Sequence, residues 1–148
     1  MKTLLSWIFA VAFVTIVVIA DSSDAFAQRR VALVVGNATY KTDNLSLANP
    51  LNDAQDVSNA LKGLGFDVIT KINASKRDLD LALQDFARKA TVADSALFFY
   101  AGHALQYQGA NYLMPTDAQL EDDVSIKYDM VSLDYVREAL DRTRGVKS

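Results

Sequence analysis

Three short apolar runs in the middle of the chain have the pattern of buried strands. The first, Val31 to Val35, is continuous and rich in β-branched residues, and it ends at Gly36-Asn37. Residues 66–72 and 95–101 form two similar runs. Continuous apolar runs of this length are typical of strands that are buried on both faces, as in parallel sheets covered by helices.

Two segments with helical periodicity separate these runs. The first begins at Asn49-Pro50, where asparagine suits the N-cap and proline suits the first helical position, and it ends at Gly65. The second begins with Ser75 and Asp78, which form a capping-box pattern. The order strand, helix, strand, helix, strand predicts right-handed crossovers. We therefore expect an α/β fold, a three-layer sandwich with a mostly parallel sheet flanked by helices.

The C-terminal part continues this pattern incompletely. Gly109 separates two short strand-like runs before Pro115, which predicts a small hairpin. A polar stretch follows, and Ser132 caps a last predicted helix with an apolar stripe. Residues 142–148 are mostly polar where an alternating α/β pattern calls for another strand. We therefore expect the sheet to be incomplete at the C-terminus of this chain.

The first 27 residues have the layout of a secretory signal peptide. Lys2 precedes an uncharged apolar run over 4–20, and Ala25-Phe26-Ala27 supplies a cleavage signal of small residues flanking a large one. Cleavage there predicts an exported protein, periplasmic or secreted, with one folded domain over 28–148. The apolar run is also close to the minimum length for a bilayer span, so an uncleaved membrane anchor is the alternative.

Composition excludes several classes of site. The 15 basic and 18 acidic residues are scattered, without the basic stripe that a nucleic-acid partner requires. The chain contains no cysteine and one histidine, so we expect no disulfide, no zinc cluster, no metal and no cofactor. Gly36 stands alone after the first strand, which argues against a nucleotide-binding domain with a glycine-rich phosphate loop. The absence of cysteine also excludes a thiol nucleophile within this chain.

The single histidine follows the third predicted strand. Working residues of open parallel sheets gather at the carboxyl ends of the strands, and His103 comes directly after one such end. An imidazole there can act as a general base and acid near neutral pH. The alternative is that the side chain only hydrogen-bonds its own loop. Position alone leaves both interpretations open.

Five sequence blocks, in order, resemble the large-subunit domain of caspase-like and metacaspase-like cysteine peptidases. The resemblance covers residues 29–144, and its most specific element is the Tyr-x-Gly-His pattern that ends at His103. The blocks are 30–37, 47–54, 63–68, 99–103 and 109–117. The resemblance implies a caspase-like fold and places residues 28–148 as a partial large-subunit domain, which ends before the catalytic cysteine of the family.

The resemblance also implies roles for individual residues. His103 matches the catalytic histidine, which activates the thiol and protonates the leaving amine. Ala104 stands where the family usually has a glycine whose N–H binds the oxyanion, and an alanine that needed a positive φ would turn that donor away. Asp53 matches an aspartate that holds a substrate arginine or lysine, although an aspartate in a first helical turn can also serve only the helix dipole. Tyr100 is interpreted as a packing residue.

Two functions from different classes follow. The first is a cysteine endopeptidase domain that cleaves protein or peptide substrates after arginine or lysine, with a nucleophile from sequence beyond Ser148 or from another chain that completes the fold. The second is a secreted, catalytically inactive caspase-like protein that serves as a protein-interaction module. The missing thiol motivates the second interpretation.

Overall fold

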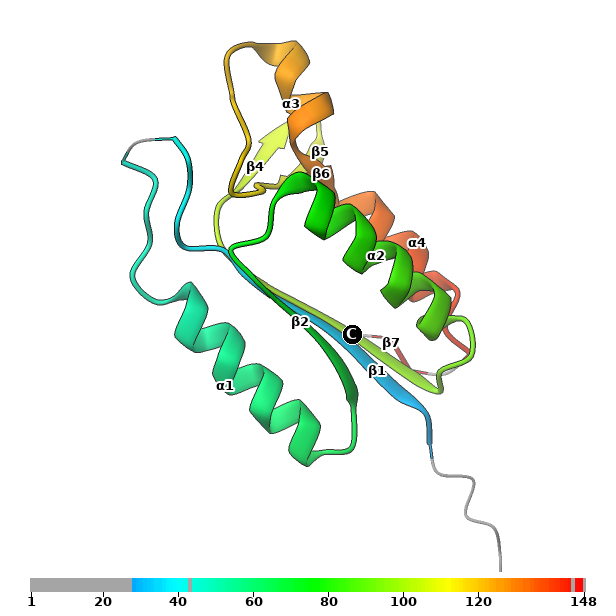
Figure 1. Cartoon of the computed structure of the whole chain (residues 1–148). Coiled ribbons are helices and arrows are strands. Elements are labelled where there is room, and N and C mark those ends of the chain that lie inside the picture. Colours follow the sequence, from blue (N-terminus) through cyan, green and yellow to red (C-terminus); the bar gives the residue numbers. More distant parts are fainter. Residues whose placement is uncertain (1–27, 43, 145, 148) are drawn as a thin grey trace, which may run out of the picture.

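The computed structural model describes residues 28–42, 44–144 and 146–147, and a parallel sheet lies at its centre (Figure 1). The sheet has the order β2-β1-β3-β7. Its strands are β1 (Arg30–Gly36), β2 (Asp67–Ile72), β3 (Ser95–Ala101) and the two-residue β7 (Val146–Lys147). The three predicted strands are confirmed to within one residue at each end. The predicted signal peptide lies outside the described residues.

Helices cover both faces of this sheet. Helix α1 (Pro50–Gly63) lies on one face, and α2 (Lys76–Ala90) and α4 (Leu133–Asp141) lie on the other (Figure 1). Alternate residues of β1 point to opposite sides, so Ala32 and Val34 pack against α1, whereas Leu33 and Val35 pack against α2 and α4. This alternation explains why β1 is apolar throughout, and it confirms the three-layer α/β sandwich.

The helix ends follow the predicted signals in one case and depart from them in the other. Ser75 and Asp78 form a complete capping box at the start of α2, and hydrogen bonds from the Ser75 hydroxyl and amide lower the pKa of Asp78. Asn49 occupies the N-cap of α1, but its side chain makes no capping hydrogen bond. Pro50 at the first helical position therefore starts α1 without side-chain capping, and the helix ends at Gly63, two residues before the predicted Gly65.

A second, antiparallel sheet lies beside the carboxyl end of the first. It consists of β4 (Ala104–Tyr107), β5 (Ala110–Leu113) and β6 (Val131–Ser132), in that order. The predicted hairpin is confirmed: Gln108 and Gly109 have φ values of 50° and 80° and connect β4 to β5. Positive φ at both positions is the conformation of a two-residue type I′ turn.

Helix α3 (Asp123–Asp129) was not predicted from the sequence. It begins with a capping box between Asp122 and Ser125, inside the stretch interpreted only as polar. None of its residues is fully buried. Because the helix packs little apolar surface, it lacks the apolar periodicity by which a helix is recognised in a sequence.

The edge of β3 is only partly occupied. Strand β7 pairs in parallel with Ser95 and Ala96 at the start of β3. Among the described residues, no strand pairs with 97–101 on that side. The alternating pattern called for a strand in this segment, and β7 is that strand; within the described residues it pairs with only the first part of β3.

Candidate active site

The carboxyl ends of β1 and β3 bring the candidate residues to one edge of the sheet. Gly36 and Ala101 are paired in the parallel register, and the Asn37 amide donates a 2.8 Å hydrogen bond to the Ala101 carbonyl. His103 follows two residues after Ala101. The strand ends lead into the loop before α1 and into the small antiparallel sheet (Figure 1). The predicted position of His103 at the rim of the sheet therefore agrees with the structure.

The imidazole of His103 is half-buried and is held by a main-chain group. Its Nε2 lies 2.8 Å from the carbonyl oxygen of Leu45, and its ring packs against Tyr40 with 5.0 Å between ring centroids. A carbonyl oxygen only accepts, so Nε2 carries the proton in the neutral ring. Nδ1 then has a free lone pair, and none of the described residues is hydrogen-bonded to it. This tautomer suits a general base that acts through Nδ1.

Two tyrosine hydroxyls fix the backbone of His103. The Tyr40 hydroxyl accepts a 2.9 Å hydrogen bond from the His103 amide and donates to the Asn37 carbonyl. The Tyr100 hydroxyl lies 2.8 Å from the His103 carbonyl oxygen and 2.9 Å from that of Met114. Burial, followed by the nearby Tyr40 hydroxyl, raises the pKa of Tyr100 well above its usual range, which keeps it a proton donor. Tyr100 therefore has a positioning role beyond the predicted packing.

Glycine at position 102 lets the two tyrosine hydroxyls approach the backbone closely. A Cβ at this position would lie 2.7 Å from the Tyr40 oxygen and 2.7 Å from the Tyr100 oxygen. Both contacts are shorter than real Cβ atoms show. The glycine of the Tyr-x-Gly-His pattern is thus explained by close approach of the two hydroxyls that hold the histidine backbone.

The side chain of Asn37 connects the chain segments on which the site is built. Its side chain is fully buried; its Oδ1 accepts a 2.8 Å hydrogen bond from the Ala74 amide, and its Nδ2 donates to the Met114 carbonyl at 3.0 Å. These bonds join the ends of β1, β2 and β5. The side chain of Asn37, at the end of the first predicted strand, thus pairs two main-chain groups from distant segments.

Ala104 is the first residue of β4 and is exposed. Its φ is not positive, because the positive-φ residues other than glycine in the described part of the chain are Asn44, Asn73 and Gln108. An extended backbone accepts alanine as readily as glycine. The substitution of the family's glycine by alanine therefore does not turn the Ala104 N–H away.

Asp53 lies in the first turn of α1, at the same end of the sheet. Helix α1 meets β1 there closely, since a Cβ on Gly36 would lie 2.5 Å from the Pro50 carbonyl oxygen. The carboxylate of Asp53 is exposed, and no hydrogen bond or ion pair within the described residues joins it to His103 or to any other side chain. Both interpretations of Asp53, substrate contact and helix-dipole partner, are compatible with this placement.

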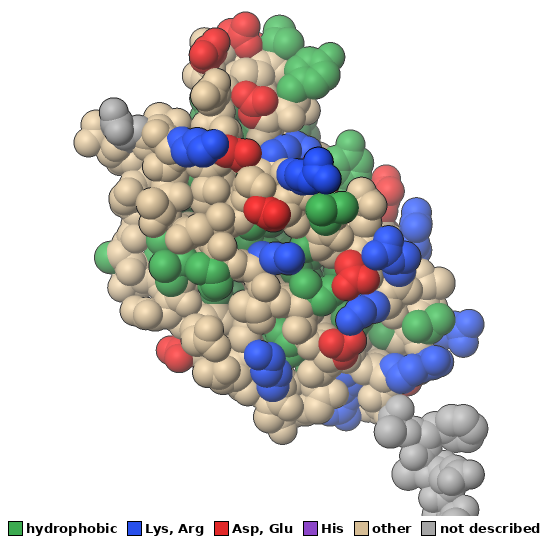
Figure 2. All heavy atoms as spheres, in the orientation of Figure 1, with side chains coloured by type: hydrophobic (Ala, Val, Ile, Leu, Met, Phe, Trp, Pro, Cys, Tyr) green, Lys and Arg blue, Asp and Glu red, His purple; other side chains and the backbone are tan. Residues whose placement is uncertain are grey.

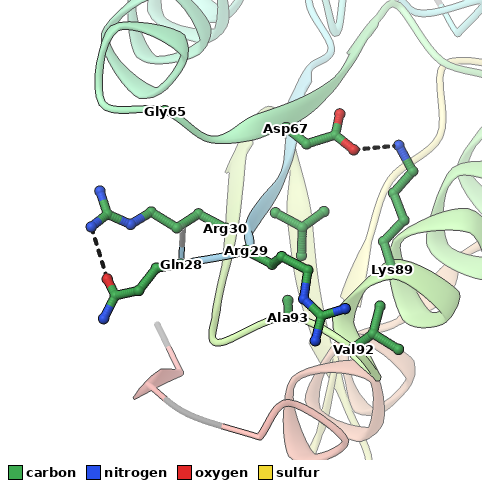
Figure 3. A pocket seen from close by; sticks show the side chains of 9 residues that line it. Gln28, Arg29, Arg30, Gly65, Asp67, Lys89, Val92 and Ala93 are labelled. Carbon is green, nitrogen blue, oxygen red and sulfur yellow. Dashed lines mark hydrogen bonds and ion pairs between the residues drawn. The ribbon is translucent and has the colours of Figure 1, made fainter. Parts of the chain in front are cut away.

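The surface also carries a hollow at the opposite end of the main sheet. This hollow, lined by Arg29, Arg30 and Lys89, lies where the strands begin, and a 2.7 Å ion pair joins two of its lining residues, Lys89 and Asp67 (Figure 3). Basic and acidic side chains are interspersed over the face drawn in Figure 2. Within the described ranges, no group of three or more potential ligands is arranged to hold a metal ion, and no helix there is long and apolar enough to cross a membrane.

Known proteins share part of this sequence. Human mucosa-associated lymphoid tissue lymphoma translocation protein 1 is 29% identical over 92 residues, which are 62% of this chain and 11% of that protein. Caspase a of Danio rerio is 26% identical over 85 residues, or 56% of this chain and 22% of that protein. The chain thus spans between about a tenth and a fifth of the length of these relatives.

Solved structures share the fold. The Drosophila initiator caspase Dronc superposes with a TM-score of 0.58 at 13% identity, covering 76% of this chain and 41% of that one. A protein from Geobacter sulfurreducens superposes with a TM-score of 0.59 at 16% identity, covering 80% and 47%. The sequence model of the family described as Caspase domain matches residues 29–144. The chain therefore belongs to the Caspase domain family of peptidases.

Proposed function

We propose that this chain supplies the acid–base half of a cysteine-type endopeptidase that cleaves proteins or peptides after arginine or lysine. One observation carries the proposal: the Leu45 carbonyl anchors the His103 ring through Nε2 and leaves Nδ1 with a free lone pair at the carboxyl edge of the sheet. This free nitrogen at the end of β3 is the base that the proposed reaction needs.

The proposed mechanism uses His103 twice. Nδ1 takes the proton of a thiol, and the thiolate attacks the scissile carbonyl carbon to form a tetrahedral oxyanion. The Ala104 N–H donates to this oxyanion. The C–N bond then breaks as the imidazolium gives its proton to the leaving amine. Water, deprotonated by the same imidazole, attacks the thioester, and the acid product and the thiol are released.

The thiol has to come from outside the printed chain, which contains no cysteine. The parallel pairing of β7 with the start of β3 supports a path for such a segment along the β3 edge. Any strand that fills the rest of this edge in the same direction ends at the rim where His103 lies. A coding sequence after codon 148 with an apolar strand pattern and then a cysteine is the expected source. A downstream region without that pattern would leave only a partner chain to supply the thiol.

Asp53 is proposed to recognise the basic side chain of the substrate. In protein that includes the cysteine-bearing segment, we expect Asp53→Asn to lower kcat/KM for arginyl reporter peptides by roughly 10- to 100-fold, since a charge-assisted pair is lost. Asp56→Asn, also exposed on α1, is the matched control and is expected to change cleavage little. If Asp53 serves only the helix dipole, its replacement would lower the melting temperature slightly and leave the arginyl preference unchanged.

Export is proposed from the leader alone. Removal of residues 1–27 would leave a mature chain that begins at Gln28, and mass spectrometry of the purified protein from its native host would show that N-terminus. An intact Met1 in the folded product would instead support the membrane-anchored alternative.

A secreted pseudoenzyme is the second candidate, favoured by the absence of cysteine. It shares the fold and predicts binding of protein segments without cleavage. Arginyl and lysyl reporter peptides distinguish the two candidates when the protein includes the cysteine-bearing segment or the partner chain that supplies the thiol, because a pseudoenzyme then still releases no product from either peptide.

A further inference from the structure

Strand β4 is an open edge that begins beside the candidate catalytic histidine. The antiparallel sheet has the order β4-β5-β6, so β4 is paired on one side only. Within the described residues, no main-chain hydrogen bond joins the other side of β4 to a neighbouring segment. Its first residue, Ala104, directly follows His103.

The pairing with β5 determines which main-chain groups of β4 face outward. His103 and Met114 form a hydrogen-bonded position, since the Met114 amide donates to the His103 carbonyl at 3.0 Å. Hydrogen-bonded and non-hydrogen-bonded positions alternate along an antiparallel pair. The pairs Ala104↔Leu113 and Gln106↔Asn111 are therefore non-hydrogen-bonded. The N–H and C=O groups of Ala104 and Gln106 consequently point away from β5.

The two-residue turn gives the same assignment independently. A type I′ hairpin closes on a hydrogen-bonded pair, which here is Tyr107↔Ala110. Counting back from that pair again leaves 104 and 106 facing outward. The side chains of Ala104 and Gln106 are exposed, whereas Leu105 packs in the cluster that contains Tyr40 and the Leu45 segment. The edge is thus accessible and is held by the same residues that hold His103.

We propose that the β4 edge binds the part of an extended peptide substrate that follows the scissile bond, as one added strand. This inference rests on the proposed function for the position of the scissile bond. His103 has to reach the leaving amine, and β4 continues from His103, so the leaving side of the peptide passes along β4. Peptides commonly bind in this way to an exposed sheet edge through main-chain hydrogen bonds.

The added strand has a defined register. With the scissile carbonyl oxygen on the Ala104 N–H, a peptide running parallel to β4 places the N–H of the second residue after the scissile bond on the Ala104 carbonyl. The carbonyl of that same residue then accepts from the Gln106 N–H. Both contacts use main-chain groups, so this edge recognises an extended peptide of any sequence at those positions.

The test is a binding measurement on the whole chain, by fluorescence anisotropy with a labelled peptide that has one arginine followed by five uncharged residues. Gln106→Pro removes the outward N–H and suits an edge strand. It is expected to weaken binding about fivefold, as for one main-chain hydrogen bond. Gln106→Ala keeps the N–H, and we expect binding equal to that of the unaltered protein. Equal binding by the proline variant, or equal weakening by both variants, would overturn the proposal.

Ester-substituted peptides test the same register on the unaltered protein, whether or not Gln106→Pro folds. An ester in place of the amide before the second residue after the arginine removes the N–H that faces Ala104, and is expected to weaken binding about fivefold. An ester in place of the next amide removes an N–H that points away from β4 in this register; this peptide is the control and is expected to bind like the all-amide peptide. Equal affinities of all three peptides would overturn the proposal that the peptide binds along the β4 edge.

A short acyl-arginyl amidomethylcoumarin reporter has no residues after the scissile bond, so with protein that includes the cysteine-bearing segment it reports on the proposed function alone. Its cleavage, together with equal affinities for the three peptides, would contradict only the β4 edge. If the reporter is not cleaved, but the first ester weakens binding and the control ester does not, only the catalytic proposal is contradicted.

Discussion

Replacing His103 by alanine is expected to lower kcat/KM for arginyl and lysyl reporter peptides by roughly 10³-fold, in protein that includes the cysteine-bearing segment. The variant removes the only imidazole of the chain, and with it both the base that activates the thiol and the acid that protonates the leaving amine. The ring is half-buried and contacts Tyr40, so thermal unfolding of the same variant measures how much of the loss is structural. Release of coumarin from the reporters measures the rate.

Tyr40→Phe serves as the matched comparison for His103→Ala. It keeps the ring beside His103 but removes the hydroxyl that accepts from the His103 amide. We expect a smaller loss of cleavage than with His103→Ala, because the imidazole and its Leu45 anchor are still present. Cleavage that survives His103→Ala undiminished would contradict the proposed mechanism. Absence of cleavage by protein that carries the cysteine-bearing segment and is otherwise unaltered would favour the pseudoenzyme.

Asn37→Ala is expected to lower the free energy of unfolding by about 3 kcal/mol, since it leaves a buried amide of Ala74 without its partner and takes a donor from the Met114 carbonyl. The Asn37 side chain is fully buried, so water does not replace these bonds without opening the core. Urea denaturation measured by circular dichroism gives this free energy.

Asn111→Ala is the control for Asn37→Ala. Asn111 is an exposed asparagine on β5, and its replacement is expected to change the free energy of unfolding by less than about 0.5 kcal/mol. Comparable losses in the two variants would show that the Asn37 hydrogen bonds contribute little beyond an ordinary asparagine.

The main sheet was predictable because its residues carry strong local signals. The short, β-branched apolar run over Val31 to Val35 favours a strand buried on both faces, and the capping box at Ser75 marks a helix start by chemistry that operates within four residues. Helix α3 was missed for the opposite reason, because it buries no side chain completely and so leaves no apolar stripe in the sequence.

Within the candidate site, the sequence identified side chains but not their partners. The resemblance indicated His103, Ala104 and Asp53, and the structure places all three at the carboxyl end of the sheet while leaving their proposed roles to experiment. The Leu45 carbonyl that anchors the imidazole was not predictable, since any residue type carries a carbonyl and 58 positions separate the two residues. The role of Tyr100 was underestimated for a similar reason, because its acceptors are also main-chain atoms.

The sequence by itself determined the order of strands and helices, the family and the single histidine at the end of a strand, because local periodicity and motif residues specify these properties. Only the tertiary structure decided the tautomer of His103, the direction of the Ala104 N–H and the open edge of β4. Those three properties depend on main-chain groups brought together from distant segments, and main-chain groups are the same in every sequence.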